Sequence, residues 1–189
     1  MNQPPSSTRV TLRHVALTDC DEFLSLMHKS RELHHPWIFP PLSNSAFEQY
    51  VERMKRDDNE GLLVCERSYG RIIGVINLNN IVRGALLSAS LGYYAGATYS
   101  GQGYMIEGLE LAKNHAFENL LLHRLEANIQ PGNHRSIALV KRCGFTKEGY
   151  SPAFLFIDGA WRGHERWTCV DDRDSILPGG GNTHKRNVS

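Results

Sequence analysis

The sequence of 189 residues contains no apolar run near the ~20 residues that a membrane-spanning helix needs. It also lacks an excess of one charge, because 21 Lys and Arg stand against 20 Asp and Glu, a formal net charge of +1. Residues 1–8 are polar and include two prolines, which is unlike a signal peptide. We therefore expect neither a membrane nor nucleic acid as a direct partner.

Metal-binding patterns are missing as well. The four cysteines are far apart, and the sequence has neither a CxxC nor an HExxH motif. His34 and His35 are adjacent, but no further ligand follows at a metal-binding spacing, so we expect no metal site. In a chain without a signal peptide, such cysteines are expected to be reduced thiols, which predicts a cytoplasmic protein.

What is present is the composition of one globular domain, with 41% apolar and 22% charged residues. Residues 1–7 are expected to form a flexible N-terminal tail. Residues 173–189 include a glycine run and many polar residues, and are expected to form a flexible C-terminal tail. A single domain is thus expected over residues 8–172.

The N-terminal half shows one strand, two helices and a three-stranded meander. Alternation at 10–13 predicts the first strand. Thr18 is a candidate cap for the first helix, and Ser43 or Ser45 for the second. Three apolar runs separated by turns predict antiparallel strands at 62–66, 72–78 and 86–95.

The C-terminal half alternates helices and strands. A helix is expected at 102–119 and a second from Asn133 to Arg142, ended by Gly144. Strands are expected at 123–129, 154–157 and 161–170, the last two forming a hairpin around Asp158 and Gly159. This order predicts a mixed α/β sheet whose central strands flank a glycine-led helix.

The glycine-bearing loop at 96–103 joins a strand to that helix. A helix start offers unpaired N–H groups and a positive dipole end, and glycines let a phosphate approach the backbone closely. Gly101 and Gly103 could therefore cradle a pyrophosphate. The same pattern also occurs in ordinary tight turns. It lacks the third glycine of a dinucleotide fingerprint and the Lys-Ser/Thr of a P-loop.

Further motifs in the correct order resemble the GNAT acyltransferase superfamily, and specifically its ribosomal-protein-alanine N-acetyltransferase (RimJ/RimL) branch. The resemblance spans residues 9–170. Its motifs are Leu91-Gly92-Tyr93-Tyr94, Tyr99-x-Gly101-x-Gly103-Tyr104-Met105-x-Glu107, Asn133-x-x-Ser136, Cys143-Gly144-Phe145 and Asp158-Gly159-x-Trp161-x-x-His164.

The resemblance implies an α/β (α+β) GNAT fold. Such a fold has a mixed, mostly antiparallel twisted sheet of about seven strands and about four helices. A central V-shaped splay separates two parallel strands, here the one ending near Ala95 and the one from His123. It also implies acetyl-CoA as the cofactor, bound in the V, and an acceptor amine.

Carried over by position, main-chain groups of three strand residues would hold the acetyl group and the pantetheine arm, and Asn133 would contact the arm. Loop amides would hold the pyrophosphate. Two loop positions depart from the family's broader pattern: Ser100 stands where Arg or Gln is usual, and Met105 where Gly or Ala is usual, although Met is usual in the RimJ/RimL branch. The cofactor-binding residues expected are Tyr93, Tyr94, Ala95, Ser100, Gly101, Gln102, Gly103, Tyr104, Met105 and Asn133.

Acetyl transfer to an amine needs a neutral amine, a donor for the carbonyl oxygen and a proton for the leaving thiolate. The Tyr94 amide is the expected oxyanion donor. Many members of the superfamily protonate the thiolate with a tyrosine, and here Val140 stands in its place. Ser136, one turn earlier on the same helix face, is a candidate proton donor, or it only completes the helix start.

The base is open among His164, Glu165, Glu107 and a water chain. Trp37, Phe39 and Tyr50 could line an acceptor cleft or belong to the core.

Three functions fit these residues. The first is acetylation of a protein N-terminal α-amine, the second acetylation of a small-molecule amine, and the third a CoA-binding sensor without catalysis. The α-amine is favoured by the resemblance and by its pKa of about 7.7–8.0, against about 10.4 for lysine. The sequence leaves open whether the chain is a monomer or a homodimer.

Overall fold

A computed structural model describes residues 9–171. The expected tails at 1–7 and 173–189 lie outside this range. Within it, no helix is both long and apolar enough to cross a bilayer.

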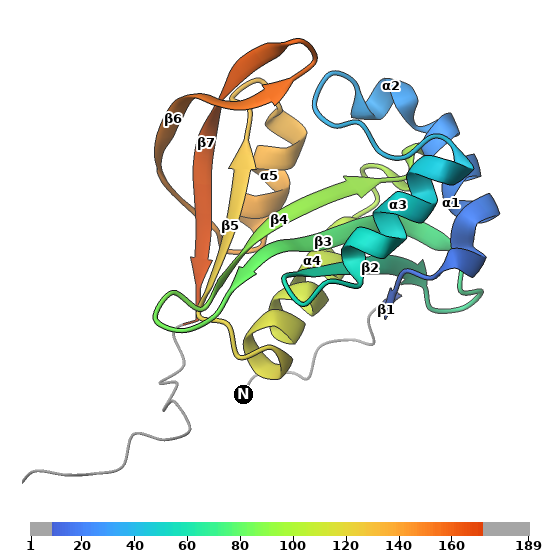
Figure 1. Ribbon diagram of the computed structural model, residues 1–189, viewed down its shortest axis with the longest axis horizontal. Helices are drawn as coiled ribbons and strands as arrows, with labels where there is room; N and C mark the ends of the chain where they lie inside the picture. The colour runs from blue at the N-terminus through green and yellow to red at the C-terminus, as the bar shows by residue number, and fades with distance from the viewer. Residues whose placement is uncertain (1–8, 172–189) are drawn as a thin grey trace, which may run out of the picture.

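Seven strands form one sheet in the order β1-β2-β3-β4-β5-β7-β6 (Figure 1). All neighbours pair antiparallel except β4 and β5, which are parallel. The predicted order of strands along the chain, the antiparallel meander and the hairpin around Asp158 and Gly159 are confirmed, although the strand expected at 154–157 begins already at Thr146. The strands are β1 (Val10–His14), β2 (Asn59–Glu66), β3 (Ile72–Val82), β4 (Ser88–Ala95), β5 (Arg124–Ile129), β6 (Thr146–Ile157) and β7 (Ala160–Val170).

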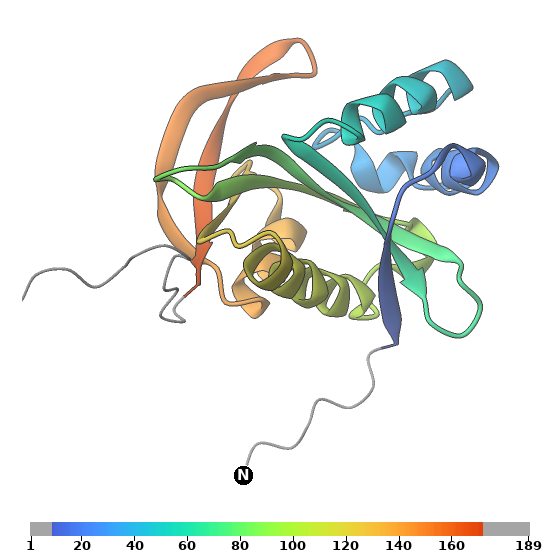
Figure 2. The same ribbon diagram turned by 60° about the horizontal axis from the view of Figure 1, so that its bottom comes forward.

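Helices cover both faces of the sheet, as Figure 2 shows. Those from the N-terminal region pack on one face, with Phe23, Phe47 and Tyr50 in a shared core. The other two pack on the opposite face. About four helices were expected, and residues 9–171 contain five α-helices, one of them a single turn: α1 (Cys20–Lys29), α2 (Arg31–His34), α3 (Asn44–Met54), α4 (Tyr104–Asn114) and α5 (His134–Arg142).

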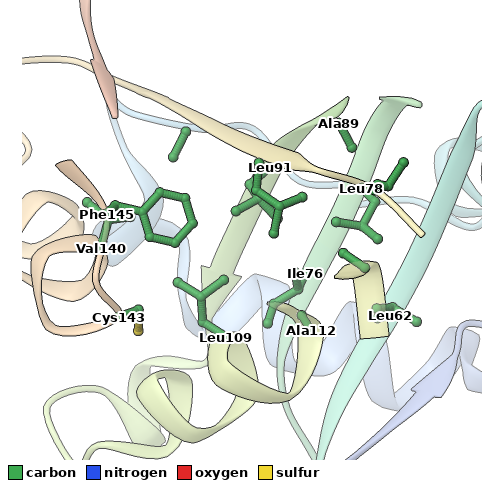
Figure 3. Packing of buried hydrophobic residues seen from close by; sticks show 14 of the residues in the cluster. Leu62, Ile76, Leu78, Ala89, Leu91, Leu109, Ala112, Val140, Cys143 and Phe145 are labelled. Atoms are coloured by element: carbon green, nitrogen blue, oxygen red, sulfur yellow. The ribbon is translucent and has the colours of Figure 1, made fainter. Parts of the chain in front are cut away.

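The larger core lies between the sheet and helices α4 and α5. Leu109 and Ala112 of α4 reach the strands, while Val140 of α5 and Phe145 close one side (Figure 3). All four side chains are buried. This packing fixes the start of α4 relative to the end of β4.

Local hydrogen bonds explain where the helices begin. Ser43 Oγ accepts the N–H of Ala46, so Ser43 is the cap of α3. The expectation for Thr18 is wrong. The carboxylate of Asp19 accepts from the Ala16 N–H and from Arg13, which holds a 3-10 turn over Leu17–Asp19 and delays α1 to Cys20.

The expected helix at 102–119 is shorter and changes type. Gly103 has a φ of +84°, a left-handed conformation, so α4 begins at Tyr104. From His115 to Asn119 the chain forms a π-helix, in which the Leu120 N–H bonds to the His115 carbonyl at 3.1 Å.

The central strands part as predicted. Parallel pairing of β4 with β5 runs from Ser88 opposite Arg124 only to Leu91 opposite Ala127. Beyond this point β4 stays with β3, and β5 stays with β7. Figure 1 shows the two strands diverging, which confirms the V-shaped splay.

Candidate functional site

Main-chain groups of β4 face the V at alternate residues. The Gly96 N–H bonds to the Ile73 carbonyl at 2.7 Å, which fixes the phase of the β3–β4 ladder. Because hydrogen-bonded pairs alternate in an antiparallel ladder, Tyr94 opposite Val75 is also such a pair. The N–H and C=O of Tyr94 therefore point at β3.

This hydrogen-bonding pattern rules out the Tyr94 amide as the oxyanion donor and leaves the amides of Tyr93 and Ala95 as candidates. The Tyr94 amide cannot donate to an oxyanion in the V, since the neighbouring strand uses it. Tyr93 and Ala95 lie in the pairs that are not hydrogen-bonded to β3, so their main-chain groups point toward the gap beside β5. The Ala95 carbonyl is already in contact with His34 Nε2 at 2.9 Å.

The two tyrosine side chains point to opposite faces of the sheet. That of Tyr94 lies under α1 and α3, packed against Phe23 and His34. Burial raises its pKa well above the ordinary value, so it stays a neutral phenol. The side chain of Tyr93 packs against the other core, on the side of α5.

Tyr93 and Ser136 form a hydrogen-bonded pair at the mouth of the V. Ser136 Oγ donates to the Tyr93 phenol oxygen at 2.7 Å. Burial raises the pKa of Tyr93, so the phenol keeps its proton at neutral pH. The pair therefore offers two hydroxyl groups where the sequence indicated only one.

The hydrogen bond of the Asn133 cap shows that Ser136 can take part in the helix start and still act as a proton donor. Asn133 Oδ1 accepts the Ser136 N–H at 3.1 Å, so capping uses the main chain of Ser136 and leaves its hydroxyl for Tyr93. Val140, at the family's usual tyrosine position, is fully buried in the core. Sequence reasoning missed the Tyr93 side chain because a strand tyrosine is also a common core residue.

The glycine loop has the geometry of an anion cradle. Gly101 has a φ of +78° and Gly103 one of +84°. The first helical bonds come from Ile106 and Glu107 to the Gly103 carbonyl. The N–H groups of the preceding residues, Tyr104 and Met105, thus have no acceptor within the helix and point outward at its start.

Arg9 contacts this loop, and no local feature of the sequence predicts that contact. Its Nη2 donates to the Gln102 carbonyl at 3.0 Å and its Nε to Glu107 at 2.6 Å. Its guanidinium lies 4.3 Å from the centroid of the Tyr104 ring. Arg9 places a cation at the loop that has Ser100 in place of the family's usual Arg or Gln.

The three candidate bases have different surroundings. Glu107 is paired with Arg9, and Glu165 with Lys147 at 2.5 Å and with Trp167. Glu165 lies opposite Ile129 of the larger core, so the side chain of His164 is on the other face of the sheet, where its ring contacts Phe154.

His164 is buried at 2% exposure, with Nδ1 at 3.0 Å from the Arg162 carbonyl. A proton on Nδ1 satisfies that contact and leaves the Nε2 lone pair as a proton acceptor. Burial lowers the pKa of His164, which keeps the imidazole neutral at pH 7.

The loop between α2 and α3 lies across the top of the V. A Cβ placed on Gly132 would be 3.1 Å from the Trp37 ring, so this loop rests on the β5–α5 connection. His35 Nε2 also lies 3.8 Å from Asp158 Oδ2 at the β6–β7 turn.

The other two N-terminal aromatics have separate places. Phe39 is exposed and lines a hollow of about 710 Å³ beside α1 and α2. Tyr50 is core, with its hydroxyl donating to Asn77 at 2.7 Å.

Comparisons with known proteins agree with this geometry. The family model described as "Acetyltransferase (GNAT) domain" matches residues 9–146. Probable N-acetyltransferase YjcK of Bacillus subtilis is 30% identical over 173 residues, 87% of this chain and 96% of that protein. The [Ribosomal protein uS5]-alanine N-acetyltransferase of Escherichia coli is 45% identical over 93 residues, 49% of this chain and 48% of that protein.

Among solved structures, RimJ of Mycobacterium smegmatis in complex with CoA-disulfide superposes with a TM-score of 0.78 at 25% identity. The match covers 85% of this chain and 81% of that one. The stretch matched by the family model, residues 9–146, contains both strands of the V and the helix that follows the glycine loop. The chain belongs to the GNAT acetyltransferases and is an N-acetyltransferase that uses acetyl-CoA.

Proposed function

We propose that the acceptor is the N-terminal α-amine of a protein, with a ribosomal protein as the natural class. The observation that carries this proposal is His164, which is buried and neutral on the face of the sheet opposite to Glu165, while the carboxylates of Glu107 and Glu165 are both held in ion pairs. An imidazole is a weak base, and an α-amine with a pKa of about 7.7–8.0 needs only a weak base.

The residues divide the reaction between the two faces of the sheet. The glycine loop and Arg9 hold the pyrophosphate end, and Asn133 holds the arm. On the opposite face His164 Nε2 accepts the proton of the amine as nitrogen attacks the acetyl carbon and the C–N bond forms. The N–H of Tyr93 or Ala95 stabilises the charge on the carbonyl oxygen.

The leaving group takes its proton on the other side. As the C–S bond breaks, the thiolate receives a proton from the Ser136–Tyr93 pair. Both hydroxyls are neutral and already linked, so one can replace the proton that the other gives up. No side chain forms a covalent intermediate in this scheme.

Relatives support the acceptor class. The protein from Escherichia coli is named as an N-acetyltransferase of an alanine in ribosomal protein uS5, and it matches 49% of this chain at 45% identity. The cytoplasmic location predicted from the sequence belongs to the same proposal, and it agrees with four cysteines that form no disulfide within the described residues: Cys20, Cys65, Cys143 and Cys169.

Two peptides of one sequence test the acceptor. One has a free α-amine and a blocked lysine, and the other has the reverse. The α-amine peptide should be acetylated faster at pH 7, because over 99% of lysine amines are charged there on the basis of a pKa of about 10.4. Faster reaction of the lysine peptide would contradict the proposal. If both are rejected while spermidine is acetylated, the acceptor is a small-molecule amine.

A further inference from the structure

Two histidines and a glutamate from distant parts of the sequence meet at the edge of the sheet near β1. The ligating atoms of His14, Glu60 and His115 all lie within 4.8 Å of one another. Glu60 Oε2 is 2.7 Å from His115 Nε2 and 3.5 Å from His14 Nε2. Nothing in the acetyl-transfer site uses this cluster.

The fold explains why the three side chains share one place. His14 lies opposite Leu62 in the β1–β2 ladder, so Glu60, two residues before Leu62, is its diagonal neighbour on the same face. Leu62 belongs to the core under α4, and the end of α4 therefore brings His115 over that face.

His115 also begins the π-helix that follows α4. A π turn inserts an extra residue into a helix and is frequent at functional sites. Here it sets the direction of the chain after α4 while the side chain of Asn119 interacts with His115. An outer partner of this kind orients the imidazole of a metal-bound histidine.

We propose that His14, Glu60 and His115 bind a divalent cation of the zinc class. Two imidazoles and one carboxylate are a common ligand set for Zn²⁺, whereas Mg²⁺ and Ca²⁺ prefer oxygen ligands. Zinc bonds of about 2.0–2.1 Å in a tetrahedron place ligand atoms about 3.4 Å apart. The 3.5 Å separation of His14 and Glu60 already fits this value.

Of the two distances from Glu60, only the one to His115 is shorter than a tetrahedral zinc site requires. The His115 ring must move back from Glu60 by about 0.7 Å to reach the tetrahedral spacing, as its hydrogen bond gives way to the metal. Side-chain exposures of 20% for Glu60 and 25% for His115 leave both partly shielded from water. His14, at 65%, opens to solvent, which leaves room for water as a fourth ligand.

The bound ion would tie β1 and β2 to the end of α4. Arg9 directly precedes β1, at the other end of the strand from His14, and its bond to Glu107 already links β1 to the start of α4. The cation would therefore stabilise the helix that carries the acetyl-CoA loop without touching the loop, and we expect a structural effect.

Calorimetric titration of the tag-free, full-length protein with zinc chloride tests the site. One equivalent should bind with a dissociation constant of about 10 μM or tighter, and the melting temperature should rise on binding. Glu60→Gln and His14→Gln should each weaken binding at least tenfold. His123→Gln removes an exposed histidine elsewhere and is the matched control, with unchanged binding.

Two results would overturn the proposal. One is zinc binding weaker than about 100 μM in the unaltered protein. The other is unchanged affinity in either Glu60→Gln or His14→Gln. Since His14 is mostly exposed, its variant is expected to fold normally, which circular dichroism can verify. The visible spectrum of bound Co²⁺ gives a second readout, because its shape reports the coordination geometry.

Discussion

The Ser136–Tyr93 pair gives a prediction that separates catalysis from folding. Ser136→Ala removes one hydroxyl and its 2.7 Å hydrogen bond, while the Asn133 cap on the Ser136 N–H is kept. Alanine is also a good helix former. The cost in free energy of unfolding should therefore be that of one hydrogen bond, about 1 kcal/mol.

The effect on turnover should be much larger. If the pair protonates the thiolate, Ser136→Ala lowers kcat by ~10²-fold or more, with the dissociation constant of acetyl-CoA nearly unchanged. Release of free thiol at saturating peptide measures kcat, and calorimetry measures cofactor binding. Tyr93→Phe is the matched variant, since it removes only the other hydroxyl.

The pattern of the two variants decides the roles. A large loss in both variants supports a linked pair. A loss in Tyr93→Phe alone makes the phenol the proton donor and Ser136 its positioning residue. Full activity in both would refute the reasoning and leave the thiolate to be protonated by water.

Three further predictions concern the loop and the base. Gly103→Val should raise the dissociation constant of acetyl-CoA at least ~10-fold, about 1.4 kcal/mol, because a φ of +84° strains a branched residue; an unchanged titration would contradict the loop assignment. Arg9→Gln should weaken the same binding by about 10-fold, since it removes a charge-assisted bond to the loop, and Arg67→Gln, in the turn that follows β2, is the control. Because burial lowers the pKa of His164 below its usual value of about 6.5, kcat should fall only as the pH falls below about 6.5. The stability that comes from burying the neutral imidazole should be lost over the same pH range. His164→Gln should remove this acidic limb of the pH–rate profile.

Much of the fold could be predicted because local signals agreed with tertiary packing. Alternating apolar residues marked the strands, and Asn133 capped α5 as its position implied. The start of α1 could not be predicted from Thr18, because the ion pair of Asp19 with Arg13 is a contact between two elements. The π-helix over His115–Asn119 likewise could not be predicted, because the apolar spacing there continues that of α4.

The sequence predicts which segments contribute to the site, but not the directions in which their groups point. Motif order located the loop and Ser136, but the direction of each strand amide depends on ladder phase, which requires the partner strand. Motif order alone therefore places the Tyr94 amide in the V, whereas pairing with Val75 directs it at β3. Arg9 is 98 residues from Glu107, and no spacing rule connects them.

The central claim is that this enzyme acetylates a protein N-terminus. One peptide that carries both a free α-amine and a free lysine tests it directly, with acetyl-CoA at pH 7 and the acetyl group located by fragmentation in a mass spectrometer. The account predicts at least about 10-fold more acetyl on the α-amine, in keeping with its lower pKa. Acetyl found mainly on the lysine would contradict it.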